Sequence, residues 1–66
     1  MIKNKRGQSI SDRLSEEFDY IKRLVDENQR VMLAYKALGA ADIAIEFGLI
    51  TYTEWEIFVK DFFRVA

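Results

Sequence analysis

The 66-residue chain contains no histidine and no cysteine. Zinc fingers, haem and iron–sulfur sites, disulfide scaffolds and redox motifs depend on these two residue types, so the sequence excludes those classes. The usual general base and the thiol nucleophile are missing as well. So small a fold also has little room for a pocket that excludes water. We therefore expect a protein that is not an enzyme and that binds no metal and no cofactor.

A long hydrophobic run is also absent. The least polar stretch, residues 38–50, contains Asp42 and Glu46, whereas a bilayer span needs about 20 apolar residues. The basic start of the chain runs into Gly-Gln-Ser, without the apolar stretch of a signal peptide. A chain without cysteine is compatible with a reducing compartment. The sequence therefore predicts a cytoplasmic protein that does not enter a membrane.

Proline is absent and there are only three glycines, so few residues can interrupt a helix. Residues 1–8 have no hydrophobic periodicity and carry the bases Lys3, Lys5 and Arg6. We interpret them as a flexible basic tail, followed by a single small helical domain over residues 9–66. The net charge is −1, and the apolar second half of the chain is also its acidic half.

Apolar or seam positions recur at 4-3 spacing in the first half of the chain. This is the a/d spacing of packed helices, and it predicts one long helix over residues 12–38. Asn28 lies within the seam, where it either pairs with its symmetry mate in an oligomer or lies at the edge and meets water. The seam positions are Leu14, Phe18, Ile21, Val25, Asn28, Met32 and Tyr35.

A short segment, residues 40–47, follows the long helix. Gly39 either ends that helix or is absorbed into one that continues through the segment. Only Asp42 and Glu46 are strongly polar here, so we expect the segment to be mostly covered. Gly48 is expected to end it.

The strongest local signal is a helix start in the last third of the chain. Thr51 with Glu54, and Thr53 with Glu56, both have the spacing of a capping box, and they predict a helix over residues 54–64. Its apolar stripe is almost entirely aromatic and consists of Trp55, Phe58, Val59 and Phe62.

The segment Gly48-Leu49-Ile50-Thr51, with Glu54 and Phe58 behind it, resembles the short C-terminal oligomerisation modules found in many bacterial proteins. The resemblance implies self-association.

The aromatic stripe can be either the core of the domain or an anchor for a partner. Large rings each bury roughly 150–250 Å², and so small a chain has little interior left for Ile57, Phe63 and Val65. Surplus apolar surface indicates a second chain. We therefore predict an all-α helical hairpin of two to three helices, two copies of which pair into a dimeric bundle.

The residues expected at the dimer or partner interface are drawn from the seam and the stripe. They are Phe18, Ile21, Val25, Asn28, Met32, Tyr35, Trp55, Phe58, Phe62 and Phe63. The leading functional hypothesis is a self-associating adaptor or inhibitor that binds another protein. A structural subunit of a larger assembly is one alternative, and the small size alone suggests a phage or mobile-element origin.

A small DNA-binding regulator is the other alternative, because residues 40–59 fit the apolar spacing of a helix-turn-helix. This stretch contains no Lys or Arg, and binding to a phosphate backbone depends on basic side chains. We therefore expect no nucleic-acid partner. The i,i+4 carboxylate pairs Asp12/Glu16 and Asp42/Glu46 are expected to be solvated helix faces.

Overall fold

Three helices make up most of the computed structural model, which describes residues 3–4 and 8–66 and the side chains from Ser9 onward. The helices are α1 (Ile10–Lys22), α2 (Glu27–Glu46) and α3 (Tyr52–Val65). The prediction of an all-α fold is confirmed for the helical domain. Of the predicted flexible tail, residues 1–2 and 5–7 lie outside the described residues. The backbone of β1 (Lys3–Asn4) pairs antiparallel with β2 (Gln8–Ser9).

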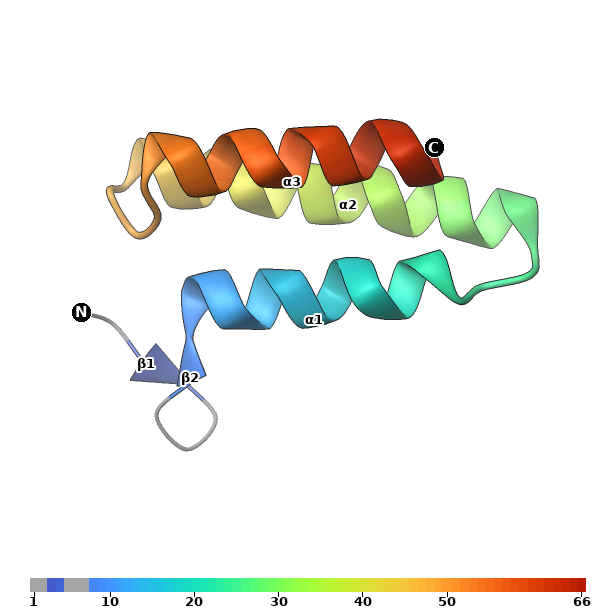
Figure 1. Cartoon of the computed structure of the whole chain (residues 1–66), viewed down its shortest axis with the longest axis horizontal. Helices are drawn as coiled ribbons and strands as arrows, with labels where there is room; N and C mark the ends of the chain where they lie inside the picture. The colour runs from blue at the N-terminus through green and yellow to red at the C-terminus, as the bar shows by residue number, and fades with distance from the viewer. Residues whose placement is uncertain (1–2, 5–7) are drawn as a thin grey trace.

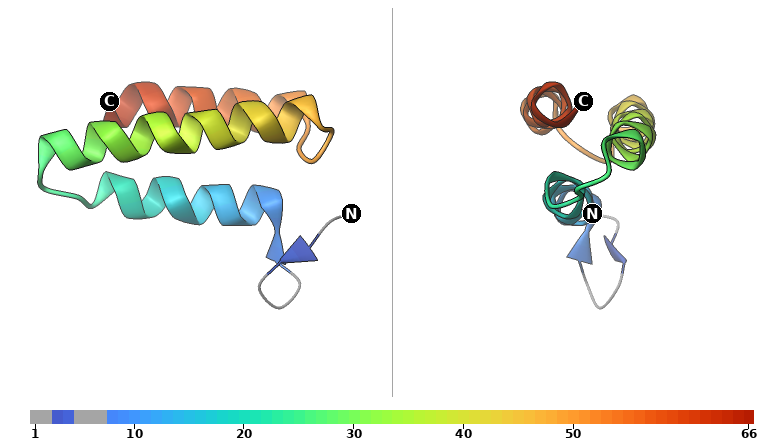
Figure 2. Two further views of the ribbon diagram at one scale, coloured as in Figure 1. Left: turned by 180° about the vertical axis from the view of Figure 1, so that it is seen from behind. Right: turned by 90° about the vertical axis from the view of Figure 1, so that its right-hand side faces the viewer.

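The three helices form a bundle in which each lies beside the other two (Figures 1 and 2). Consecutive helices run antiparallel, and the end-on view in Figure 2 shows them at the corners of a triangle. A helix-turn-helix motif instead crosses its two helices at about 90–120°. The α2–α3 pair is therefore a hairpin of neighbouring bundle helices.

The prediction of one long helix over residues 12–38 is wrong, because α1 ends at Lys22 and α2 begins at Glu27. Asp26 caps the new helix: its side chain accepts a hydrogen bond from the backbone N–H of Gln29 at 2.9 Å. Asp is among the best N-cap residues. The 4-3 spacing continues through the connection, but the cap decides where the chain turns.

Arg30 stabilises this connection from the first turn of α2. Its Nε donates to the carbonyl of Val65 at 3.1 Å, and its Nη1 donates to the carbonyl of Leu24 at 3.2 Å. Val65 is the last residue of α3 and Leu24 follows the end of α1, so neither carbonyl has an N–H donor within its own helix. One partly buried guanidinium thus ties all three helices together at this end of the bundle.

The 40–47 segment is fused to the preceding helix, so that Gly39 lies inside α2. The predicted stop at Gly48 is confirmed: its φ is 73°, a left-handed conformation that favours glycine. The N–H of Gly48 donates to Ile45 at 3.1 Å, and that of Leu49 donates to Ala44 at 2.8 Å. This pair of bonds is a Schellman motif, which satisfies the last carbonyls of α2.

Helix α3 begins at Tyr52 with Thr51 as its N-cap, two residues before the predicted start. Of the two candidate capping boxes, the structure forms the earlier one. The N–H of Glu54 donates to Thr51 Oγ1 at 3.1 Å, and the N–H of Thr51 donates to Glu54 Oε1 at 2.8 Å. Two N–H groups at the helix end are satisfied reciprocally.

The core is built from large side chains of α1 and α3 against small ones of α2. Phe18 and Phe58 are almost fully buried and stack with ring centroids 5.8 Å apart. Lys22 of α1 and Asp61 of α3 form an ion pair at 3.4 Å. The remaining buried apolar residues are Leu14, Ile21, Ala34, Ala37, Ala41, Ala44, Ile50, Phe62 and Val65.

Candidate interaction surfaces

The burial of apolar side chains on α2 is unusual for a helix of a single small domain, because small ones are buried and several large ones are exposed. The residues that it buries are all alanines, namely Ala34, Ala37, Ala41 and Ala44. Of its larger apolar side chains, Leu33, Leu38 and Ile45 are partly buried against the core. Three others are exposed: Met32 is 64% exposed, Ile43 is 59% exposed, and Phe47 at the helix end is 73% exposed. A helix that is apolar on every side is normally surrounded, whereas α2 contacts only α1 and α3.

We call the uncovered side of this helix the α2 outer face. Residues spaced by 4-3-4 lie on one side of a helix, and here that side is opposite the buried alanines. The face consists of Met32, Lys36, Gly39, Ala40, Ile43, Glu46 and Phe47, all of which are exposed except the partly covered Gly39. Two of these seven residues are charged.

An apolar groove of about 350 Å³ adjoins the α2 outer face on the side of α1. Ile10 and Leu14 form its α1 wall, and Ala40 and Ile43 form its α2 wall. Of the described residues that line it, Arg13 alone is charged. The apolar surface of α2 therefore extends without interruption toward α1.

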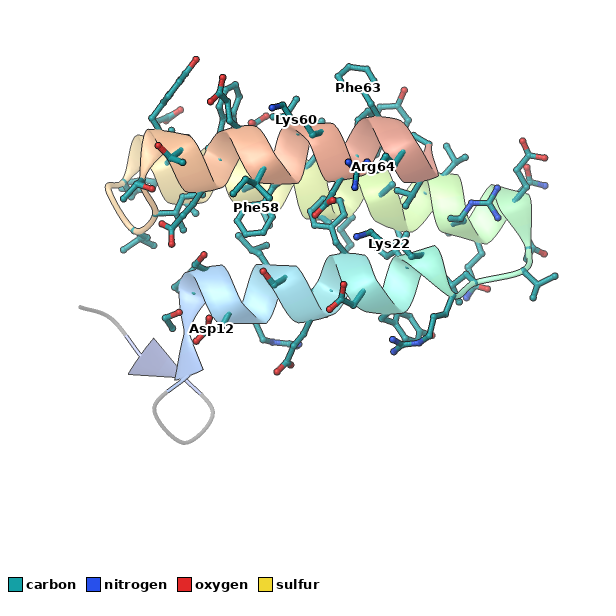
Figure 3. All side chains as sticks on the ribbon, in the orientation of Figure 1. Asp12, Lys22, Phe58, Lys60, Phe63 and Arg64 are labelled. Carbon is teal, nitrogen blue, oxygen red and sulfur yellow. The ribbon has the colours of Figure 1, made fainter. Side chains whose placement is uncertain are left out.

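A second apolar surface lies where α2 meets α3, and we call it the aromatic face. Tyr35, Phe62 and Phe63 are in successive ring contact, with centroid distances of 4.9 Å for Tyr35–Phe62 and 5.3 Å for Phe62–Phe63. Phe63 is 75% exposed and points away from the bundle, whereas Phe58 points inward (Figure 3). Tyr52 and Trp55 complete the face, with ring centroids 5.6 Å apart.

Asp42 positions the indole of Trp55 within the aromatic face. The indole Nε1–H donates to Asp42 Oδ1 at 2.7 Å. This is the short distance of a bond to an ionised acceptor, and it links the last turns of α2 to the first turn of α3. The carboxylate of Asp42 thus has a structural partner on α3.

The structure separates the residues predicted to lie at an interface into two groups. Phe18, Ile21, Phe58 and Phe62 are core residues of the single chain, and Trp55 is partly buried. The other five are exposed: Val25 in the connection after α1, Asn28 at the start of α2, Met32 on the α2 outer face, and Tyr35 and Phe63 on the aromatic face. This second group and the exposed part of Trp55 are accessible to another molecule.

Sequence reasoning missed Ile43 and Phe47 as surface residues. The 40–47 segment was expected to be mostly covered, and in the single chain that expectation is wrong for these two side chains. The available signal was the helical period: Ile43 and Phe47 lie on one side of a helix and Ala41 lies on another, so that only one of these two sides can face the core.

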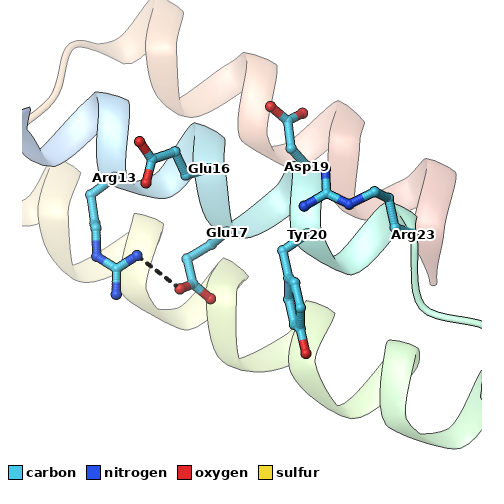
Figure 4. Close-up of a pocket in the computed structure, with 6 residues that line it drawn as sticks. All are labelled: Arg13, Glu16, Glu17, Asp19, Tyr20 and Arg23. Atoms are coloured by element: carbon cyan, nitrogen blue, oxygen red, sulfur yellow. Dashed lines mark ion pairs between the residues drawn. The ribbon is translucent and has the colours of Figure 1, made fainter.

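The outer side of α1 is a charged surface exposed to solvent. It forms a shallow depression lined by Arg13, Glu16, Glu17, Asp19, Tyr20 and Arg23 (Figure 4). Arg13 pairs with Glu17 at 3.2 Å, and Asp19 approaches Lys22 at 3.9 Å. Exposed pairs of this kind contribute about 0–1 kcal/mol each. Within residues 9–66, no cluster of acidic side chains could hold a metal ion.

The ionisation of Glu54 is tied to the fold. The backbone N–H of Thr51 donates to it and lowers the pKa of Glu54 below its ordinary value of 4.5, and a hydrogen bond with the Ser11 side chain lowers the pKa further. Both bonds favour the charged form. The contact with Ser11 also links the start of α3 to the first turn of α1.

None of the described helices combines the length and the apolar character needed to span a bilayer. Comparison of the chain with models of known protein families, with curated proteins and with solved structures gave no match in any of the three.

Proposed function

We propose that this chain is a non-enzymatic protein-interaction module that associates with itself and serves as an adaptor or inhibitor of a protein partner. The observation that carries the proposal is that α2 buries small apolar side chains and exposes several large ones. Met32, Ile43 and Phe47 are exposed on a helix that buries only alanines. Exposed contiguous apolar surface on a small domain marks an interaction site.

Two separate apolar surfaces suit an adaptor better than a protein that only pairs with itself. The α2 outer face lies along α2, whereas the aromatic face consists mainly of side chains of α3. Aromatic residues dominate the energetics of interface centres, and the aromatic face has Tyr35, Tyr52 and Phe63 exposed. One surface can therefore bind a second copy while the other binds a different protein.

A nucleic-acid partner is less well supported by the same surfaces. The exposed acids Asp42, Glu46 and Glu56 surround the α2–α3 turn, and a phosphate backbone would be repelled there. Helices α2 and α3 also lie side by side rather than crossing (Figure 1). The DNA-binding alternative stays a prediction, and duplex binding that weakens steeply with salt would favour it over our proposal.

The proposal is tested by thermal unfolding at several protein concentrations, followed by circular dichroism. Association stabilises the folded state by mass action, so the midpoint temperature is expected to rise with concentration. A midpoint that does not change with concentration, together with the mass of a single chain, would remove self-association from the proposed function.

A further inference from the structure

We infer that the α2 outer face binds the same face of a second copy of this chain, with the two α2 helices antiparallel. The inference rests on the proposed function and specifies the surface and the geometry of its self-association. Three features of α2 carry it: its uncovered apolar side chains, its central glycine and the order of its charges.

The first feature is the extent of the uncovered surface. The face runs from Met32 to Phe47, which corresponds to about 22 Å of helix. Its apolar members are large side chains that the fold leaves in water, and the adjoining groove of Ile10, Leu14 and Ala40 broadens it toward α1. A second helix laid along α2 would cover a side of it that α1 and α3 do not reach.

The second feature is Gly39, near the middle of this face. Glycine inside a helix costs about 1 kcal/mol relative to alanine. Within the single chain nothing lies within 4 Å of where a Cβ would be, so the fold does not require its absence. A glycine does allow a neighbouring helix to approach closely. The packing of the single chain therefore does not explain why position 39 is a glycine, whereas close approach by a helix of another molecule does.

The third feature identifies the neighbour as a second copy. Lys36 lies in the first half of the face and Glu46 near its end, both exposed, and neither has an ion-pair partner within residues 9–66. In an antiparallel pair, Lys36 lies near Glu46 of the other copy, so opposite charges meet at both ends. A parallel pair would place like charges together, which is unfavourable.

The same register also matches the shapes of the two faces. When Lys36 lies level with Glu46 of the second copy, Ile43 lies level with Gly39 of that copy. The large side chain of each helix then faces the residue of the other that has no side chain. A two-fold arrangement makes both contacts twice.

The test compares dimer dissociation constants of variants, measured by sedimentation equilibrium. Ile43→Ser is expected to raise the dissociation constant at least about tenfold, because it removes two central apolar contacts from a symmetric interface. Ile57→Ser is the matched control: Ile57 is 52% exposed, close to the 59% of Ile43, but lies on α3 away from α2. The control is expected to leave the dissociation constant unchanged.

Two further substitutions test the glycine and the charges. A Cβ at position 39 has no neighbour within 4 Å in the single chain, so Gly39→Leu should keep the helical content while the dimer is lost. Lys36→Glu and Glu46→Lys should each weaken the antiparallel dimer several-fold, and the two changes combined in one chain should restore it. Circular dichroism of each variant confirms that the single chain is still folded.

The outcomes separate the inference from the proposed function. A wild-type dimer that survives Ile43→Ser but dissociates with Phe63→Ser would overturn the α2 interface and leave self-association intact, through the aromatic face. Loss of the dimer with Ile43→Ser but no response to either charge reversal would overturn the antiparallel order. A wild-type chain that is monomeric at every concentration would overturn both the inference and the self-association on which it rests.

Discussion

Phe58 and Phe63 lie five positions apart on α3, and they should respond very differently to truncation. Phe58 is 2% exposed and stacks on Phe18, whereas Phe63 is 75% exposed. We therefore expect Phe58→Ala to disrupt the bundle and Phe63→Ala to leave it folded. Figure 3 shows the difference directly, because the two labelled rings point in opposite directions.

The expected magnitudes follow from these exposures. Truncation of a buried phenylalanine costs about 3–5 kcal/mol of unfolding free energy, from lost burial and the cavity left behind. Phe63 has only a quarter of its surface covered. That is roughly 50 Å², which at about 25 cal/mol per Å² contributes about 1 kcal/mol. A domain of this length is expected to have a total stability of only about 3–10 kcal/mol.

Urea unfolding followed by far-ultraviolet circular dichroism measures both values. The titrations are performed at the lowest protein concentration that gives a signal, where association contributes least. Phe63→Ala should keep a cooperative transition with a slightly lower midpoint, whereas Phe58→Ala should lower the midpoint far more or abolish the transition. Equal losses for the two variants, or a loss below about 1 kcal/mol for Phe58→Ala, would refute the described core.

Three other predictions concern the ends and the turns of the helices. Arg30→Ala is expected to lower the unfolding free energy by about 1.5–3 kcal/mol, the range for hydrogen bonds to a charged group; no measurable loss by urea titration would mean that its two carbonyl contacts do not form. Gly39→Ala should stabilise the single chain by about 0.5–1 kcal/mol, whereas Gly48→Ala should destabilise it by about 1–2 kcal/mol because of its left-handed backbone; similar effects from both would contradict the assigned turn. The lowered pKa of Glu54 means that its ionised form stabilises the folded chain above the ordinary value of 4.5, and that this stabilisation is lost as the pH falls through the folded-state pKa. Melting temperatures between about pH 6 and pH 3 should therefore fall less for Glu54→Gln than for the wild type, and identical pH profiles would argue against the capping box.

Local signals in the sequence predicted the second half of the fold well. The stop at Gly48 and the Thr51–Glu54 capping box depend on a few neighbouring residues, whose backbone preferences do not require knowledge of the rest of the chain. The choice between the two overlapping capping boxes was left open by the sequence. In the structure, the earlier box places Phe58, Phe62 and Val65 toward the core.

The first half was misread because hydrophobic spacing carries no information about a turn. Positions 25, 28, 32 and 35 continue the 4-3 pattern, yet in the structure Val25 is 94% exposed in the connection. The turn depends instead on Asp26, whose side chain is an N-cap. An acidic side chain can equally lie within a helix, and only the packing of α2 back along α1 distinguishes the two roles.

The candidate surfaces could be predicted only in general terms. The excess of apolar residues in the sequence predicts an interface. It does not determine which of the apolar side chains of α2 face the core. The structure turns the alanines inward, because the rings of Phe18, Phe58 and Phe62 already fill the space between the helices. Which face remains open is thus decided by side chains of α1 and α3, distant in sequence.

The central claim is that this chain has more apolar surface than it can cover alone. Sedimentation equilibrium of the unmodified chain, from micromolar to near-millimolar concentration, tests it most directly. Our account predicts an average mass that rises from one chain toward two as the concentration increases. A mass of one chain throughout, with Ile43 and Phe47 still accessible to solvent, would contradict it.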